Sequence, residues 1–92
     1  MSEEILTAEN EFIQGNLELC NQLVNKILAN DQMNIQALLL RAKLSYNWQK
    51  WGDALNDLNR IIEIDANHQL AKNYKQMVIN ILTYWNKDNY NP

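Results

Sequence analysis

Helix-breaking residues are scarce in this chain. Its 92 residues include only two glycines and one proline, and the proline is the last residue. Glycine and proline are the strongest interruptions of helices, so turns must come largely from asparagine-rich positions, because asparagine side chains bond to nearby backbone and favour helix ends. No stretch has the alternating pattern of a strand. These breaks predict an all-α chain of five helices, at about residues 3–14, 17–29, 35–47, 51–64 and 68–86.

The sequence also lacks long apolar runs, a second cysteine and an excess of basic residues. No run approaches the roughly 18 apolar residues of a membrane span, and the acidic start at 1–4 is the reverse of a signal peptide. Cys20 has no partner for an internal disulfide, which agrees with a reducing compartment. The net charge is −3 and the basic residues are scattered, which opposes binding to nucleic acid. We therefore expect a cytoplasmic protein that binds neither membranes nor nucleic acid.

Patterns for catalysis and metal binding are missing too. His68 is the only histidine, and the sequence contains no Cys-x-x-Cys or His-x-x-x-His spacing. We place Cys20 at a buried helix crossing, and His68 at the start of the last helix behind Asn67 as the expected N-cap. Nucleophilic catalysis needs a nucleophile, a base and an orienting group together. We expect no enzyme activity, no metal and no other cofactor. The glutamates of the N-terminal third indicate solvated helix surface; they are Glu3, Glu4, Glu9, Glu11 and Glu18.

An internal repeat relates the first helix pair to the second. A shift of about 34 residues superposes the chain on itself without a gap from Ala8 to Asp65. The matched pairs are Ala8 with Ala42, Cys20 with Ala54, Val24 with Leu58, Ile27 with Ile61, Leu28 with Ile62 and Asp31 with Asp65. This register predicts one domain, residues 1–92, with repeats at 1–34 and 35–68 and a closing helix with its tail at 69–92.

The period and the small residues together resemble the tetratricopeptide repeat (TPR) family over essentially the whole chain. In that family small residues lie where the two helices of a repeat cross and early in the second helix, as Ala42 and Ala54 do here, and Trp51 fits the aromatic residue that begins the second helix. Four positions depart from the family pattern: Leu38, Arg41, Ser45 and Ala66 replace a large aromatic residue, a leucine, a tyrosine and a proline. The ending at 81–92 resembles that of small stand-alone bacterial proteins with two such repeats. The resemblance implies an α-α superhelix of two helix-turn-helix repeats and a capping helix.

In the resembled family, the first helices of successive repeats line a concave groove that takes a peptide or a helix. Projected onto this chain, that face selects Leu39, Lys43, Tyr46, Asn47, Asn73, Met77, Asn80 and Ile81, and extends to Glu9 and Ile13 on the first helix. Asparagine amides can pair with a peptide backbone, tyrosine and methionine give adaptable apolar contact, and Lys43 can meet a carboxylate. The resemblance implies a non-catalytic adaptor or scaffold that binds another protein. Each of these residues, taken singly, is also compatible with an ordinary solvated face.

Aromatic residues gather in the C-terminal half of the chain. The last helix carries an apolar stripe roughly 160° wide, whereas one buried face requires about 100°. The excess supports an alternative function, in which Tyr84 and Trp85 pair with a second copy of the chain in a homodimer. Trp48 has two interpretations, packing onto Lys50 or marking a contact surface, and we favour local packing.

Overall fold

The computed structural model describes residues 3–89 and, within them, the side chains of residues 3–85. Five α-helices and no strand occupy this range, which confirms the all-α prediction. The helices are α1 (Glu3–Ile13), α2 (Leu17–Asn30), α3 (Ile35–Asn47), α4 (Trp51–Ile64) and α5 (Gln69–Asn89). Their starts agree with the sequence prediction to within one residue, and the largest difference is the end of α5, which extends three residues further.

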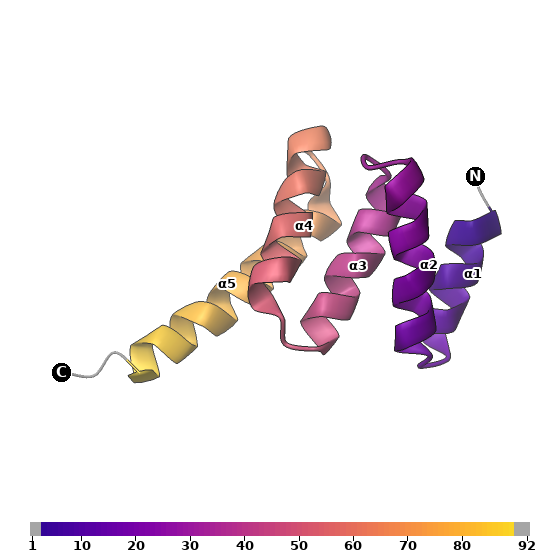
Figure 1. The fold of residues 1–92 in the computed structure, drawn as a ribbon. Helices are drawn as coiled ribbons and strands as arrows, with labels where there is room; N and C mark the ends of the chain where they lie inside the picture. Colours follow the sequence, from indigo (N-terminus) through magenta and orange to yellow (C-terminus); the bar gives the residue numbers. More distant parts are fainter. Residues whose placement is uncertain (1–2, 90–92) are drawn as a thin grey trace.

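The helices pack in chain order, each against its neighbours, and α1 also touches α3 (Figure 1). The resulting array is elongated, measuring 51 × 29 × 19 Å. The C-terminal part of α5 runs past the N-terminal end of α4 and projects from the body of the molecule (Figure 1). None of the described helices is both long and apolar enough to cross a membrane.

The α1–α2 and α3–α4 turns have the same construction, as the repeat predicts. Gly15 ends α1 with φ +85°, and Gln49 takes the equivalent left-handed conformation after α3 with φ +59°. In each turn the next backbone N–H reaches back over the left-handed residue: Asn16 donates to the Glu11 carbonyl at 2.9 Å, and Lys50 donates to that of Ser45 at 2.8 Å. This bond satisfies a carbonyl that the end of a helix leaves open. The repeat therefore preserves backbone geometry even where glycine is replaced by glutamine.

The α2–α3 and α4–α5 turns form a second matched pair. The Asp31 N–H donates to the Ile27 carbonyl and the Asp65 N–H to the Ile61 carbonyl, both at 2.8 Å. Each aspartate also accepts a backbone N–H from two residues ahead through Oδ1, at 3.3 Å for Asp31 and 3.1 Å for Asp65. Aspartate stabilises such turns because its short side chain reaches the adjacent backbone.

The helix that follows each of these turns has an N-cap at the same repeat position. Asn34 Oδ1 accepts the Ala37 N–H at 3.0 Å, and His68 Nδ1 accepts the Ala71 N–H at 3.1 Å. The prediction that Asn67 caps the last helix is therefore wrong. His68 holds the position equivalent to Asn34, and its imidazole nitrogen can accept a hydrogen bond as the amide oxygen does.

The core follows the repeat as well. The four small residues of the repeat register are all buried, as predicted for Cys20; they are Ala8, Cys20, Ala42 and Ala54. Burial raises the pKa of the Cys20 thiol, and the negative charge of Glu11 raises it further. Larger side chains fill the space between the helices, and those buried most completely are Ile5, Val24, Leu44, Leu58, Ile61 and Val78.

Candidate functional site

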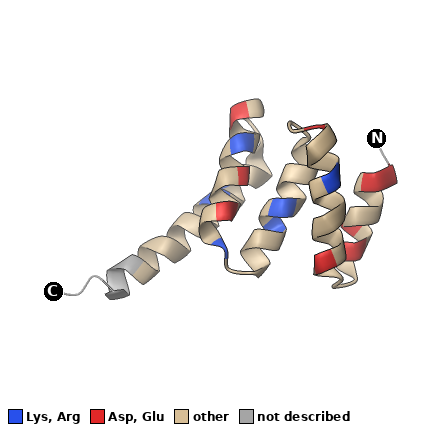
Figure 2. Cartoon of the chain, in the orientation of Figure 1, with Lys and Arg blue, Asp and Glu red and all other residues tan. Residues whose placement is uncertain are grey.

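Helix α3 lies at the centre of the array and presents two different faces. Arg41 and Lys43 are two positions apart, so they point about 200° apart around the helix axis. The Lys43 face, with Leu39, lies towards α1, and the Arg41 face, with Ser45, lies towards α2 and α4. Helix α3 has no acidic residue, whereas acidic residues gather on α1 and at the start of α2 (Figure 2).

The first face forms the floor of an apolar hollow of about 360 Å³ between α1 and α3. Its lining residues are Glu9, Phe12, Ile13, Gln36, Leu39, Leu40 and Lys43. The structure thus brings together two of the predicted groove residues, Leu39 and Lys43, with Glu9 and Ile13 of the first helix. Ile13 is 79% exposed, so a large apolar side chain stands open to solvent at the edge of this hollow. The hollow offers apolar contact with one charge of each sign at its edges.

Two predicted groove residues on α3 already have partners within the chain. The ring of Tyr46 meets those of Trp51 and Tyr74 edge-on, with centroids 5.3 and 5.9 Å apart. Such edge-to-face pairs stabilise packing, so Tyr46 joins α3 to α4 and α5. The Asn47 amide donates to the Lys43 carbonyl at 3.0 Å.

The predicted groove residues of α5 lie outside this hollow. Asn73 and Asn80 are exposed, and their Oδ1 atoms accept hydrogen bonds from Gln69 and Gln76, both at 2.9 Å. Met77 is 44% exposed and Ile81 is partly buried. These four residues form a separate surface on α5.

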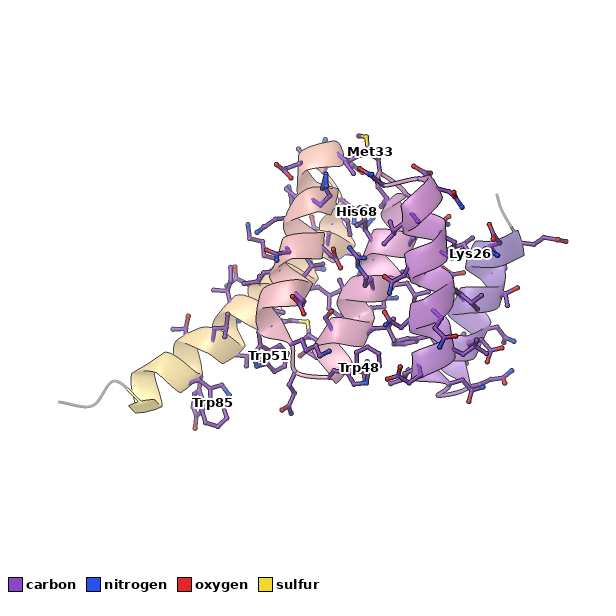
Figure 3. All side chains as sticks on the ribbon, viewed as in Figure 1. Lys26, Met33, Trp48, Trp51, His68 and Trp85 are labelled. Atoms are coloured by element: carbon purple, nitrogen blue, oxygen red, sulfur yellow. The ribbon has the colours of Figure 1, made fainter. Side chains whose placement is uncertain are left out.

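The projecting part of α5 exposes large aromatic side chains. Tyr84 is 64% exposed and Trp85 is 54% exposed, and Figure 3 shows Trp85 standing away from the helical body. Trp85 also lines a hollow of about 270 Å³ with Gln49, Trp51 and Leu82. The aromatic surface therefore continues from α5 to the start of α4.

The turn residue Trp48 packs locally, which is the interpretation that we favoured from the sequence. It is partly buried against the core, and the Lys50 ammonium lies 5.4 Å from the centre of its ring. That distance allows a cation–π interaction.

The second face of α3 carries a charged pair that sequence reasoning missed. Arg41 Nε and Nη2 donate to the two carboxylate oxygens of Asp57 on α4, at 2.8 and 2.9 Å, and Nη1 donates to Asn25 Oδ1 on α2 at 3.0 Å. The hydrogen bond to Asp57 raises the pKa of Arg41, while burial opposes this and the negative charges of Asp57 and Asp53 add to it. The contact with Asn25 links α3 to α2 of the preceding helix pair. The position of Arg41 between the apolar residues Leu40 and Ala42 is the sequence feature that indicates such a buried partner.

Cys20 and His68 lie in separate environments. Cys20 is buried, and His68 uses Nδ1 to cap α5. Within residues 3–85, no three His, Cys, Asp or Glu side chains gather as metal ligands would.

The hollow between α1 and α3 is the candidate functional site, and the aromatic surface of α5 is a second candidate. Both present large exposed apolar side chains, Ile13 in the first and Tyr84 and Trp85 in the second, and exposed apolar surface is suited to binding. Compared with known proteins, the chain matches no family model, no curated protein and no solved structure.

Proposed function

We propose that this protein is a non-catalytic interaction module of the tetratricopeptide repeat type, which binds a peptide or helix of another protein between α1 and α3. The apolar hollow at Ile13, Leu39 and Leu40 carries this proposal. The matched turns at Gly15 and Gln49 support the repeat type, because the two helix pairs share one backbone construction over the period typical of that family.

The hollow defines the chemistry of the partner segment. An apolar side chain of the partner would cover Ile13 and Leu39, which removes exposed apolar area from water. Lys43 on one edge would meet a carboxylate, and Glu9 on the other would meet a basic group. The best ligand is therefore a segment with an apolar anchor flanked by charges of opposite sign.

The test is a pull-down from an extract of the source cells with the wild-type protein and the double variant Ile13→Ser, Lys43→Glu. Both positions are at the surface of the hollow, so the variant keeps the core. The matched control is Met33→Ser, Lys72→Glu, which replaces an apolar residue by serine and a lysine by glutamate at exposed positions away from the hollow. We expect a partner that the control retains and the hollow variant loses; equal retention by both would refute this assignment.

Self-association through α5 is the second candidate function. Its support is the exposure of Tyr84 and Trp85 on a helix that projects from the body (Figure 3). Sedimentation equilibrium of the wild type and of Tyr84→Ser, Trp85→Ser separates the two candidates. A concentration-dependent dimer that the variant loses would support it, and a wild-type monomer at every practical concentration would exclude it.

A further inference from the structure

A polar cleft lies on the side of α3 opposite the apolar hollow. It consists of two adjoining hollows of about 350 and 560 Å³, which share Asn25, Arg41, Asn56 and Asp57. Helix α2 forms one wall and α4 the other, while α3 supplies the floor. The cleft and the α1–α3 hollow therefore use different residues of α3.

The floor of the cleft is fixed and its charge is largely satisfied. Arg41 donates three hydrogen bonds from its guanidinium group, two to Asp57 and one to Asn25. The cleft also contains Lys50, Asp53 and Arg60, so basic and acidic side chains nearly balance. Such a surface has no concentrated positive charge for a phosphate or another anion. Its ligand must be polar and close to neutral.

Asparagine side chains on both walls of the cleft have amide groups that are free to form further hydrogen bonds. Because Asn25 Oδ1 accepts from Arg41, that amide has a fixed orientation, and its NH₂ group remains to donate. Asn21 and Asn56 also line the cleft, and within the described part of the chain neither side-chain amide has a hydrogen-bond partner. Asn25 is thus a positioned donor, and the other two asparagines can each donate and accept.

The spacing of these side chains matches an extended polypeptide. Asn21 and Asn25 are one helical turn apart, about 6 Å, and Asn56 and Arg60 have the same separation on the facing wall. In an extended chain, peptide groups on one edge recur every two residues, about 6.6 Å. The α2 wall from Asn21 to Ala29 is about 12 Å long, enough for about four extended residues. A helical ligand could not use these amides along its length, since its own main-chain groups are already bonded internally.

We infer that this cleft binds an extended, uncharged peptide segment of another protein through its main chain. Asn21 and Asn25 pair with successive peptide groups on one edge, and Asn56 pairs with the other edge.

The experiment selects ligands from a displayed library of random heptapeptides on the folded full-length protein. The tightest binder is synthesised with blocked ends and titrated into ¹⁵N-labelled protein. We expect the side-chain NH₂ signals of Asn21, Asn25 and Asn56 to shift. Asn21→Ala, Asn56→Ala should weaken binding at least about fivefold, because each lost hydrogen bond is worth about 0.5–1.5 kcal/mol. N-methylation of alternate peptide nitrogens should abolish binding, since it removes main-chain donors.

Two further variants separate this site from the rest of the protein. Asn25→Asp keeps an oxygen for Arg41 but removes the NH₂ donor, so we expect a folded protein with weaker peptide binding. The hollow variant Ile13→Ser, Lys43→Glu should bind the selected peptide as the wild type does, so failure of the α1–α3 site and failure of the cleft are distinguishable. Maltopentaose, a neutral polar oligosaccharide, tests the alternative that the cleft binds a sugar. The inference is overturned if no peptide is selected, if the asparagine variants bind the peptide normally, or if maltopentaose shifts the same NH₂ signals more strongly than the peptide does.

Discussion

Removing either member of the Arg41–Asp57 pair should destabilise the protein, and by unequal amounts. The Arg41 side chain is 36% exposed, whereas that of Asp57 is only 10% exposed. Without Asp57, the long arginine side chain can reach water. Without Arg41, the carboxylate stays on the wall of the cleft with neither of its two charge-assisted hydrogen bonds. Arg41→Leu should therefore cost more than Asp57→Leu.

The magnitudes follow from the number and exposure of these bonds. A hydrogen bond to a charged group contributes about 1.5–3 kcal/mol, and the partial exposure of Arg41 reduces that value through solvent screening. We expect Arg41→Leu to lower the free energy of unfolding by about 2–3 kcal/mol, and Asp57→Leu by about 1 kcal/mol. The double variant should lie within about 1 kcal/mol of the wild type, because packed apolar residues can replace a buried ion pair. The first repeat supports this outcome, because Leu23 occupies the position equivalent to Asp57.

Urea unfolding followed by far-ultraviolet circular dichroism measures all four proteins of this double-mutant cycle. These values give a coupling of at least about 2 kcal/mol between Arg41 and Asp57. Leu58→Ala, next to Asp57 in the core, serves as a control. Its loss of unfolding free energy should simply add to that of Arg41→Leu, because Leu58 carries no charge that could interact with Arg41. Additive single effects, or a larger loss for Asp57→Leu than for Arg41→Leu, would refute the reasoning.

Three further predictions concern the turns and the buried thiol. Gly15→Ala should destabilise the protein by about 1 kcal/mol in urea unfolding, because φ is +85° at Gly15 and only the backbone conformation, with open space around it, opposes a side chain there. Gln49→Gly should stabilise the protein by up to about 0.5 kcal/mol, because glycine adopts the left-handed conformation of Gln49 without strain. Effects of the same sign at both positions would contradict this prediction. His68→Ala should cost about 1 kcal/mol through loss of the α5 cap, and His68→Asn should retain most of the stability, as Asn34 does for α3; equal losses in the two variants would contradict a capping role. The pKa of Cys20 is raised above its ordinary value of 9.0, so the protonated thiol favours the folded state: this stability is fully present below pH 9.0 and is lost as the pH rises above it. Urea unfolding between neutral and alkaline pH should show a smaller decline for Cys20→Ala than for the wild type, and parallel declines would count against the raised pKa.

Part of the candidate site followed from the sequence. Leu39 and Lys43 lie in one hollow with Glu9 and Ile13, because the repeat register fixes which face of each first helix turns the same way. The sequence could not show that Tyr46 packs between Trp51 and Tyr74, since those rings come from three different helices. The sequence also could not show that the predicted groove residues of α5 lie outside the hollow. A helical projection gives the direction in which each side chain points around its own helix axis, but it does not give the distance between two helices.

The sequence by itself determined the helices, their boundaries and the 34-residue relation between the two pairs. These features depend on local interactions, such as Asn34 with Ala37 and Asp31 with Met33, which the order of residues specifies directly. Only the tertiary structure decided that Arg41 holds Asp57 and Asn25, each 16 residues away along the chain. That contact exists because α3 packs against both α2 and α4, and it makes Arg41 the fixed floor of a polar cleft.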